Sequence, residues 1–314
     1  MNPALPPALT AALNGALEGV PRKALVEAAR ALSAGYRDGQ TSKGLNTPTD
    51  ALAYALARMP ATYAACAAAF ARLVEVMPGF APITLLDAGA GTGAASWAAC
   101  AAWPGIAGVT MLDANPALRA LAGQLAEQGL PSTDIAAGDL VSATGTHDLV
   151  VASYVLAEMS EAGAATAARG LWQRAGQVLV LVEPGTPQGF ARIRAARAAL
   201  IAAGAHVAAP CTHDKECPMG GDDWCHFSQR LPRSRDHMLL KDASVPFEDE
   251  RYAYVAVTRD AVARGARILA PPLESKPGLT FKLCDETGLR GAFVATRDKD
   301  EYPRVRKRVW GDLF

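Results

Sequence analysis

The chain has 314 residues, with 31 Lys and Arg against 31 Asp and Glu, so its formal net charge is zero. Half of the residues are hydrophobic, which is typical of a globular protein with enough core for about two domains. With no net positive charge, any nucleic-acid binding must depend on local clusters. No apolar run is long enough to cross a bilayer, and the start, with early prolines and no basic head, is a poor signal peptide. We therefore expect a cytoplasmic monomer that does not bind membranes.

The first 80 residues are expected to form a helical N-terminal region. Apolar residues recur at helical spacing in "TDALAYALARMPATYAACAAAFARLVEVM". Pro60 and Thr62 predict a break in this helix and a new N-cap.

From residue 83 the pattern changes to short apolar runs that alternate with helical stretches. Such alternation indicates βαβ units and a mainly parallel sheet. The runs cover residues 83–89, 108–115, 147–156 and 176–185, with further strands expected at 205–210 and 252–259. Three short strand-like runs in 265–297 predict a small antiparallel extension.

These patterns divide the chain into four predicted parts. They are a helical region (1–80), a sheet domain (81–210 and 251–260), a Cys-rich metal-binding insertion (211–250) and a β extension with a basic tail (261–314).

A glycine-rich loop, "LLDAGAGTGAAS", places Gly89, Gly91 and Gly93 between a strand and a helix. Glycines allow a tight turn and a close approach to a ligand, and the helix start offers free N–H groups, so a nucleotide-like ligand is expected. The same loop, with Asp113 about twenty residues on, also fits a loose dinucleotide fingerprint, so an NAD-binding oxidoreductase is one alternative. Asp87 weighs against it, because its carboxylate would repel a pyrophosphate but suits a cationic amino-acid moiety.

The loop, its preceding acid and two later acids together resemble the class I S-adenosylmethionine-dependent methyltransferases. The resemblance implies an α/β, Rossmann-like sheet that binds S-adenosylmethionine. It implies that Asp87 and the three glycines hold the methionine part, that Asp113 binds the ribose hydroxyls and that Asp139 lies beside the adenine.

The methyl-acceptor side is less well defined. The segment "VVASYVLAEMS" lacks two known signatures of base methyltransferases. One is an Asn or Asp followed by Pro-Pro and an aromatic residue, and the other is a Pro-Cys nucleophile. The catalytic candidates are Tyr154, which offers a ring for stacking on a base, and Glu183, which follows the fifth strand. Cofactor binding is therefore better supported than methyl transfer.

The six cysteines fall into two groups. Cys66 and Cys100 lie in alanine-rich helical stretches and are expected to be buried as small hydrophobic residues. Cys211, Cys217 and Cys225 lie in "PCTHDKECPMGGDDWCHF". Because cytoplasmic thiols are usually reduced, such a cluster points to a metal rather than to disulfides.

The spacing of the three clustered cysteines matches neither zinc fingers nor bacterial ferredoxins, so zinc and an iron–sulfur cluster both remain open. Cys284 is the candidate fourth thiolate, and His213 and His226 are possible substitutes. The loop is polar and has little core, so a metal would supply folding free energy that it lacks.

The region "PCTHDKECPMGGDDWCHFSQRLPRSRDHMLLKDASVPFEDERYAYVAVTR" resembles the methyltransferase-like family found with the small subunit of mitochondrial ribosomes, the Rsm-twenty-two type, which has bacterial members. "ALARMPATYAA", "EPGTPQGF" and the terminal "WGDLF" match it too. The resemblance implies a [4Fe–4S] cluster on Cys211, Cys217, Cys225 and Cys284, and association with small-subunit (16S-type) ribosomal RNA during assembly or translation.

Two basic clusters are candidate RNA contacts, since Lys and Arg next to aromatic residues suit phosphate contact and base stacking. They are Arg230, Arg233, Arg235 and Lys241, and then Arg304, Arg306, Lys307 and Arg308. A link through Cys284 would allow both clusters to share one face. The resulting prediction is an S-adenosylmethionine-binding, iron–sulfur-containing methyltransferase-like protein acting on small-subunit ribosomal RNA. The alternative is a catalytically inactive RNA-binding assembly factor.

Overall fold

The computed structural model describes residues 3–37, 44–140 and 142–314. It begins with three helices, α1 (Pro7–Ala16), α2 (Arg22–Arg37) and α3 (Pro48–Val76), as the sequence predicts. Within the described ranges, none of the helices combines the length and the apolar character that crossing a membrane requires.

Helix α3 is the longest element and begins at a capping box. The backbone N–H of Asp50 donates to Thr47 Oγ1 at 3.1 Å, and that of Thr47 donates to Asp50 Oδ2 at 2.9 Å. The predicted break at Pro60 is wrong, because α3 continues through it. A proline inside a helix removes one hydrogen bond, but Met59 and Tyr63 on either side are almost fully buried, and their packing offsets that loss.

The main sheet has the strand order β3-β2-β1-β4-β5-β8-β6, in which β8 runs antiparallel to both neighbours. Its strands are β1 (Thr84–Ala88), β2 (Gly108–Asp113), β3 (Ser132–Ala137), β4 (His147–Ser153), β5 (Ala175–Pro184), β6 (His206–Ala209) and β8 (Phe247–Thr258). This is the strand order of the class I methyltransferase-like fold, so the predicted fold class is confirmed. The order reverses between β1 and β4, and the ends of these strands form the expected ligand crevice.

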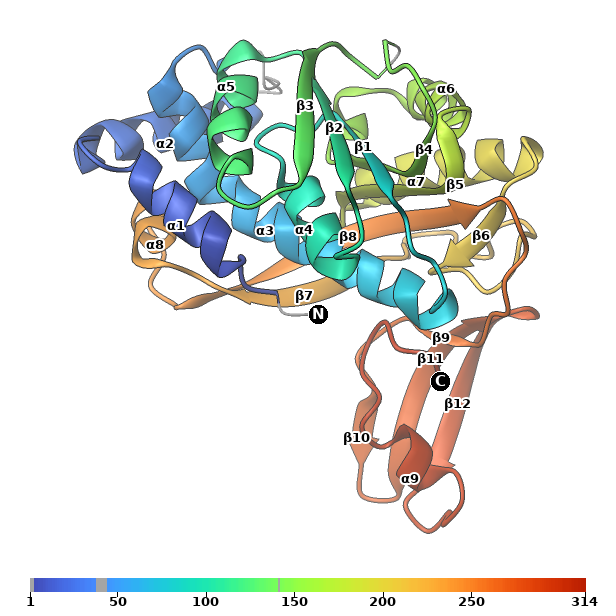
Figure 1. Ribbon diagram of the computed structural model, residues 1–314. Coiled ribbons are helices and arrows are strands. Elements are labelled where there is room, and N and C mark those ends of the chain that lie inside the picture. Colours follow the sequence, from blue (N-terminus) through green and yellow to red (C-terminus); the bar gives the residue numbers. More distant parts are fainter. Residues whose placement is uncertain (1–2, 38–43, 141) are drawn as a thin grey trace.

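Helices cover both faces of this sheet (Figure 1). They are α4 (Ala94–Ala102), α5 (Pro116–Ala126), α6 (Glu161–Trp172) and α7 (Pro187–Ala202), with a short 3-10 helix η2 (Leu156–Glu158) after β4. Helices α6 and α7 pack together on one face, and α3 packs with α4 and α5 on the other.

The second half of the predicted insertion belongs to the main sheet. Strand β7 (Phe227–Pro232) pairs antiparallel with the first half of β8, and α8 (Arg235–Leu240) follows it. The predicted boundary at residue 250 therefore lies inside β8. Residues 211–226, which carry the three clustered cysteines, have no helix or strand.

A second, four-stranded sheet projects from the main body (Figure 1). It is formed by β9 (Arg267–Ile268), β10 (Leu273–Ser275), β11 (Gly278–Asp285) and β12 (Gly288–Ala295), followed by the short α9 (Tyr302–Val305). This is the small antiparallel extension that the sequence predicts.

The buried guanidinium of Arg267 joins this extension to the body. Arg267 is 1% exposed, and its Nη1 donates to Glu75 Oε2 of α3 and to the Gly311 carbonyl, both at 2.9 Å. Its Nε donates to the carbonyl of Pro210, directly before the first clustered cysteine, at 3.3 Å. Three segments far apart in the chain therefore meet at one side chain.

Replacing Arg267 with Ala should lower the free energy of unfolding by about 2–4 kcal/mol, because the change leaves the Pro210 and Gly311 carbonyls without this donor, removes a buried side chain and takes from Glu75 the closer of its two cations. The urea midpoint followed by circular dichroism measures this loss. Arg297→Ala, which removes an exposed guanidinium from the same extension, is the matched control. Equal midpoints for the two variants would contradict the junction role of Arg267.

Candidate functional site

The glycine loop lies at the crevice between β1 and α4, and its three glycines have positive φ angles of 75°, 57° and 86°. A Cβ on Gly89 would lie 2.7 Å from Val155 Cγ2, and one on Gly93 would lie 2.9 Å from Met111 Cε. A Cβ on Gly91 would meet only the Tyr54 ring, at 3.9 Å. Packing against Val155 therefore requires glycine at 89, and the positive φ angles favour it at 91 and 93. Gly91 has the most room of the three for the approach of a ligand.

Asp113 at the end of β2 meets this loop directly. Its Oδ2 accepts a hydrogen bond from the Gly91 N–H at 2.8 Å, and its Oδ1 accepts one from the Asn115 N–H at 2.7 Å. Asn115 Oδ1 in turn caps α5, with the N–H groups of Ala117 and Leu118 as donors. The structure thus places Asp113, the residue predicted to bind the ribose, against the glycine loop. The contact with the ribose itself stays a prediction.

Asp87 is fully buried behind the loop. Its Oδ2 accepts hydrogen bonds from the N–H and Oγ–H of Ser96, at 3.0 and 2.8 Å, which tie β1 to α4. Burial raises the pKa of Asp87 to about 6, although the hydrogen bonds from Ser96 oppose this. Its Oδ1 has no hydrogen-bond partner among the described residues. A buried carboxylate oxygen left in this way suits a cationic or N–H donor, as the predicted role requires.

Asp139 lies farther along the crevice edge. It is exposed, and its Oδ1 accepts a hydrogen bond from the Ser142 N–H at 2.9 Å. It lines a groove with Leu140, Ala143 and Met159, which the glycine loop does not line. Its predicted place beside the adenine remains untested.

Tyr154, the first catalytic candidate, follows β4 in the left-handed region, with φ of 60°. Its hydroxyl donates to Glu250 Oε1 of β8 at 2.6 Å. Burial, followed by the charge of Glu250, raises the pKa of Tyr154 well above its usual value. A non-glycine residue in this backbone region is strained, and such strain is often found at functional positions. The bond to Glu250 leaves the ring of Tyr154, rather than its hydroxyl, as the group that could meet a base.

Glu183, the second candidate, is fully buried at the end of β5. Its Oε1 accepts a hydrogen bond from the Leu156 N–H at 2.8 Å, and its Oε2 has no partner in the described part of the chain. Burial raises the pKa of Glu183 to about 8, so the carboxyl group is largely protonated at neutral pH.

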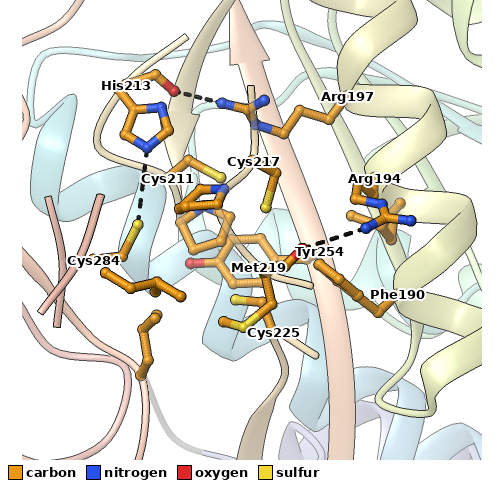
Figure 2. A pocket seen from close by; sticks show the side chains of 15 residues that line it. Phe190, Arg194, Arg197, Cys211, His213, Cys217, Met219, Cys225, Tyr254 and Cys284 are labelled. Atoms are coloured by element: carbon orange, nitrogen blue, oxygen red, sulfur yellow. Dashed lines mark hydrogen bonds between the residues drawn. The ribbon is translucent and has the colours of Figure 1, made fainter. Parts of the chain in front are cut away.

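The four predicted metal ligands converge on one cavity (Figure 2). Cys211, Cys217, Cys225 and Cys284 all line it, with Tyr254 of β8 and Met219. The cavity volume is about 30 Å³, which is more than one ordered water needs. Three of these cysteines come from the irregular segment, and Cys284 comes from β11 of the extension.

Each of these thiols contributes to the electrostatics of another. Burial raises the pKa of Cys225 well above its usual value, and Cys211, Cys217 and Cys284 raise it further. Burial and the neighbouring Cys211 and Cys217 raise the pKa of Cys284 to about 11. Closely spaced thiolates repel one another unless a metal cation compensates their charge.

The two histidines proposed as substitute ligands differ in position. His213 lines the cavity, and its Nε2 lies 4.0 Å from Cys284 Sγ. His226 instead stacks on Trp224 and meets Trp310 edge to face. His213 is thus the one of the two that faces the thiols.

Coordination geometry, however, is absent. Across residues 3–37, 44–140 and 142–314, no group of three or more His, Cys, Asp or Glu side chains is arranged to hold a metal ion. The structure therefore shows four soft donors around one cavity, and the metal itself stays a prediction.

The first basic cluster is largely neutralised by acids of β8. Arg230 forms a bidentate pair with Asp249, at 2.8 Å for both bonds, while Arg233 and Lys241 pair with Glu248. Burial alone would raise the pKa of Glu248, but hydrogen bonds from His237 and Lys241 lower it to about 2. Arg235 is exposed and makes no ion pair within the described ranges.

The second basic cluster is more available to a partner. Its members are all exposed and form no ion pair with any described residue: Arg304, Arg306, Lys307 and Arg308. Figure 1 shows α8 beside the main sheet and α9 on the projecting sheet, and the expectation that the two clusters share one face stays a prediction.

Sequence reasoning missed Glu250 and Ser96 as partners of Tyr154 and Asp87. Glu250 lies 96 positions after Tyr154, and no local pattern links the two. Ser96 is only nine positions after Asp87, but no pattern in the sequence marks it as the partner of that acid.

Comparisons with known proteins identify the family of this chain. Residues 48–314 match the family described as mitochondrial small ribosomal subunit Rsm22. The human mitochondrial ribosome assembly protein METTL17 is 28% identical over 93% of this chain and 67% of its own length. The mitochondrial Rsm22-cox11 tandem protein 2 of Schizosaccharomyces pombe is 28% identical over 90% of this chain and 45% of its own. This chain thus spans less than half of the fission-yeast relative.

Among solved structures, magnesium protoporphyrin IX methyltransferase from Synechocystis PCC 6803, with bound S-adenosylmethionine, is similar. The identity is 18%, the TM-score is 0.44, and the match covers 68% of this chain and 85% of that one. The fold assignment made above rests on the strand order and not on this similarity.

The expected cytoplasmic location is wrong by these comparisons, because the family and the relatives named above are described as mitochondrial. The expectation rested on the early prolines and the missing basic head of the first residues, and these features do not report the location of related proteins. The match over residues 48–314 shows that this chain belongs to the mitochondrial small ribosomal subunit Rsm22 family.

Proposed function

We propose that this protein binds S-adenosylmethionine and takes part in assembly of the small ribosomal subunit through contact with its RNA. The observation that carries the proposal is the family match, which includes the complete glycine loop together with the contact of Asp113 with Gly91. The human relative, named as a ribosome assembly protein, supports the same role.

The cofactor would lie over Gly91, the loop glycine with the most room around an added Cβ. Asp113 would hold the ribose hydroxyls, and the unpartnered Oδ1 of Asp87 would accept from the methionine part, directly or through water. Bound there, S-adenosylmethionine supplies an electrophilic methyl group.

We further propose that the cysteine cavity holds a [4Fe–4S] cluster on Cys211, Cys217, Cys225 and Cys284, with zinc as the alternative. Four thiols from two separate segments around one cavity support this proposal. A metal there would stabilise an irregular segment and join it to the extension.

A non-catalytic assembly factor fits an acceptor side that lacks the sequence signatures of base methyltransferases and in which the Tyr154 hydroxyl is bonded to Glu250. One observation favours an enzyme as the second candidate. Glu183 has an unpartnered Oε2 and a raised pKa, which are the properties of a general acid or base at neutral pH.

Asp113→Ala should weaken S-adenosylmethionine binding roughly 10-fold or more, because it removes the acceptor for the ribose and releases the Gly91 N–H. Titration calorimetry measures the change, with Asp134→Ala, an exposed aspartate of β3, as the control and NAD as the control ligand. Tighter binding of NAD than of S-adenosylmethionine to the wild type would overturn the cofactor proposal.

The same variant separates the two candidate functions. Immature small subunits are incubated with labelled S-adenosylmethionine and either wild-type protein or Asp113→Ala. Association with the particles that survives in the variant, without methyl transfer by either protein, supports the assembly factor. Transfer by the wild type that is lost in Asp113→Ala and in Glu183→Gln supports the enzyme.

Cys217→Ser should abolish the brown colour of protein purified without oxygen and lower its iron content from roughly four atoms per chain. Visible absorption with iron and sulfide analysis measures the loss, and Cys100→Ala, in α4, is the control that should keep both. A colourless wild type containing one zinc would show that the cluster assignment is wrong.

Glu183→Gln should flatten the pH dependence of stability. Between the unfolded value near 4.5 and the folded value of about 8, the native state holds a proton that the unfolded chain has lost. Raising the pH through this window therefore destabilises the wild type, by up to about 1.4 kcal/mol per pH unit, and the glutamine variant lacks this slope. Urea melts from pH 5 to 8 test it, with Glu127→Gln, exposed after α5, as the control. Parallel slopes for wild type and Glu183→Gln would refute the raised pKa.

A further inference from the structure

One face of the small sheet carries exposed apolar side chains in a single row. Leu273 of β10 pairs with Thr280 of β11, and Thr280 pairs with Phe293 of β12. Residues directly opposite each other in a sheet point to the same side. Leu273 is 70% exposed and Phe293 is 55% exposed, so this row faces solvent.

The ring of Phe293 leans along the sheet over a glycine. A Cβ on Gly278, which is diagonal to Phe293 in the ladder, would lie 2.9 Å from Phe293 Cζ. Gly278 is buried, whereas Phe293 is 55% exposed. The tip of the ring therefore lies over the Gly278 backbone, and more than half of the side chain is open to solvent.

This row is not needed for the core of the extension. The opposite face of the same strands packs Leu279, Phe281, Leu283 and Val294 against Val305 of α9, and Phe281 meets Phe314 at 5.1 Å. In the part of the chain that the structure describes, no helix or strand packs over the Phe293 row (Figure 1).

The charge around the row favours an anionic partner. Among the paired residues of β10, β11 and β12 that share the Phe293 side, none is acidic, and the one charged side chain, Lys282, is paired with Asp223. Exposed Lys276 lies in the turn between β10 and β11, and exposed Arg297 follows β12. In residues 261–314 Lys and Arg outnumber Asp and Glu, whereas the whole chain has 31 of each.

We propose that Phe293, with Leu273 and Thr280, is a stacking platform for an unpaired base of single-stranded RNA. The ring offers its open side to the base, and Lys276 and Arg297 neutralise the adjoining phosphates. Stacking on an aromatic ring is a common way to hold bases of unpaired RNA, and it tolerates any base sequence. The inference rests on the RNA contact proposed above and places it on a surface that the two basic clusters do not include.

The test uses the full chain and an unstructured RNA of about 12 nucleotides that carries 2-aminopurine, whose fluorescence falls on stacking. Phe293→Leu keeps the apolar character but removes the ring, and Phe293→Trp keeps an aromatic face. Ile83→Ala, which trims a side chain that is 54% exposed before β1, is the matched control. Thermal melts confirm that each variant is folded.

The expected result is a loss of affinity of roughly 10-fold for Phe293→Leu, together with loss of the fluorescence change. Phe293→Trp and Ile83→Ala should bind as the wild type does. Full binding by Phe293→Leu would overturn the platform but leave the RNA role intact. A wild type that binds no RNA, in this assay and with immature small subunits, would overturn both proposals.

Discussion

The arrangement of this molecule depends on one buried cation. Arg267 joins α3 through Glu75, the last residues through the Gly311 carbonyl, and the cysteine segment through the Pro210 carbonyl. A buried guanidinium is tolerated only when its donors are satisfied, so the three segments must hold their positions together. As a consequence Cys284, in the extension, faces the three cysteines that follow Pro210. The salt bridge of Arg72 with Asp312 and the bond from Lys215 to the Glu286 carbonyl add to this junction.

Strand β8 connects the two candidate sites of the body. Its Glu250 accepts the hydrogen bond of Tyr154 at the crevice, and its Tyr254 lines the cysteine cavity. The same strand pairs with β5, β6 and β7. A change at the cavity that shifts β8 would therefore reach the acceptor side of the crevice through packed, hydrogen-bonded residues. This is a physical route by which the cysteine segment can influence the domain that carries the glycine loop.

Charge is distributed unevenly in a chain whose net charge is zero. The cations of the first basic cluster are mostly engaged by Glu248 and Asp249, so they stabilise the β7–β8 ribbon. The cations of the second basic cluster are exposed, and the projecting sheet adds the exposed ring of Phe293. Surface arginines count toward nucleic-acid binding only when nearby acids do not already neutralise them. The projecting sheet, rather than the ribbon, is therefore the part suited to meet RNA.

The sequence alone determined the features that arise from neighbouring residues. Alternating apolar runs predicted the parallel strands, and the glycines with Asp113 located the crevice, because strand period and positive φ are local properties. The tertiary structure decided what depends on distant partners. Helix α3 continues through Pro60 because its neighbours are buried, and β7 pairs with β8 of the main sheet. The Tyr154 hydroxyl is bonded to Glu250, and acids of β8 neutralise the cations of the first basic cluster. Whether a side chain is free or bonded depends on residues that folding brings to it, and no local pattern in this chain encodes that pairing.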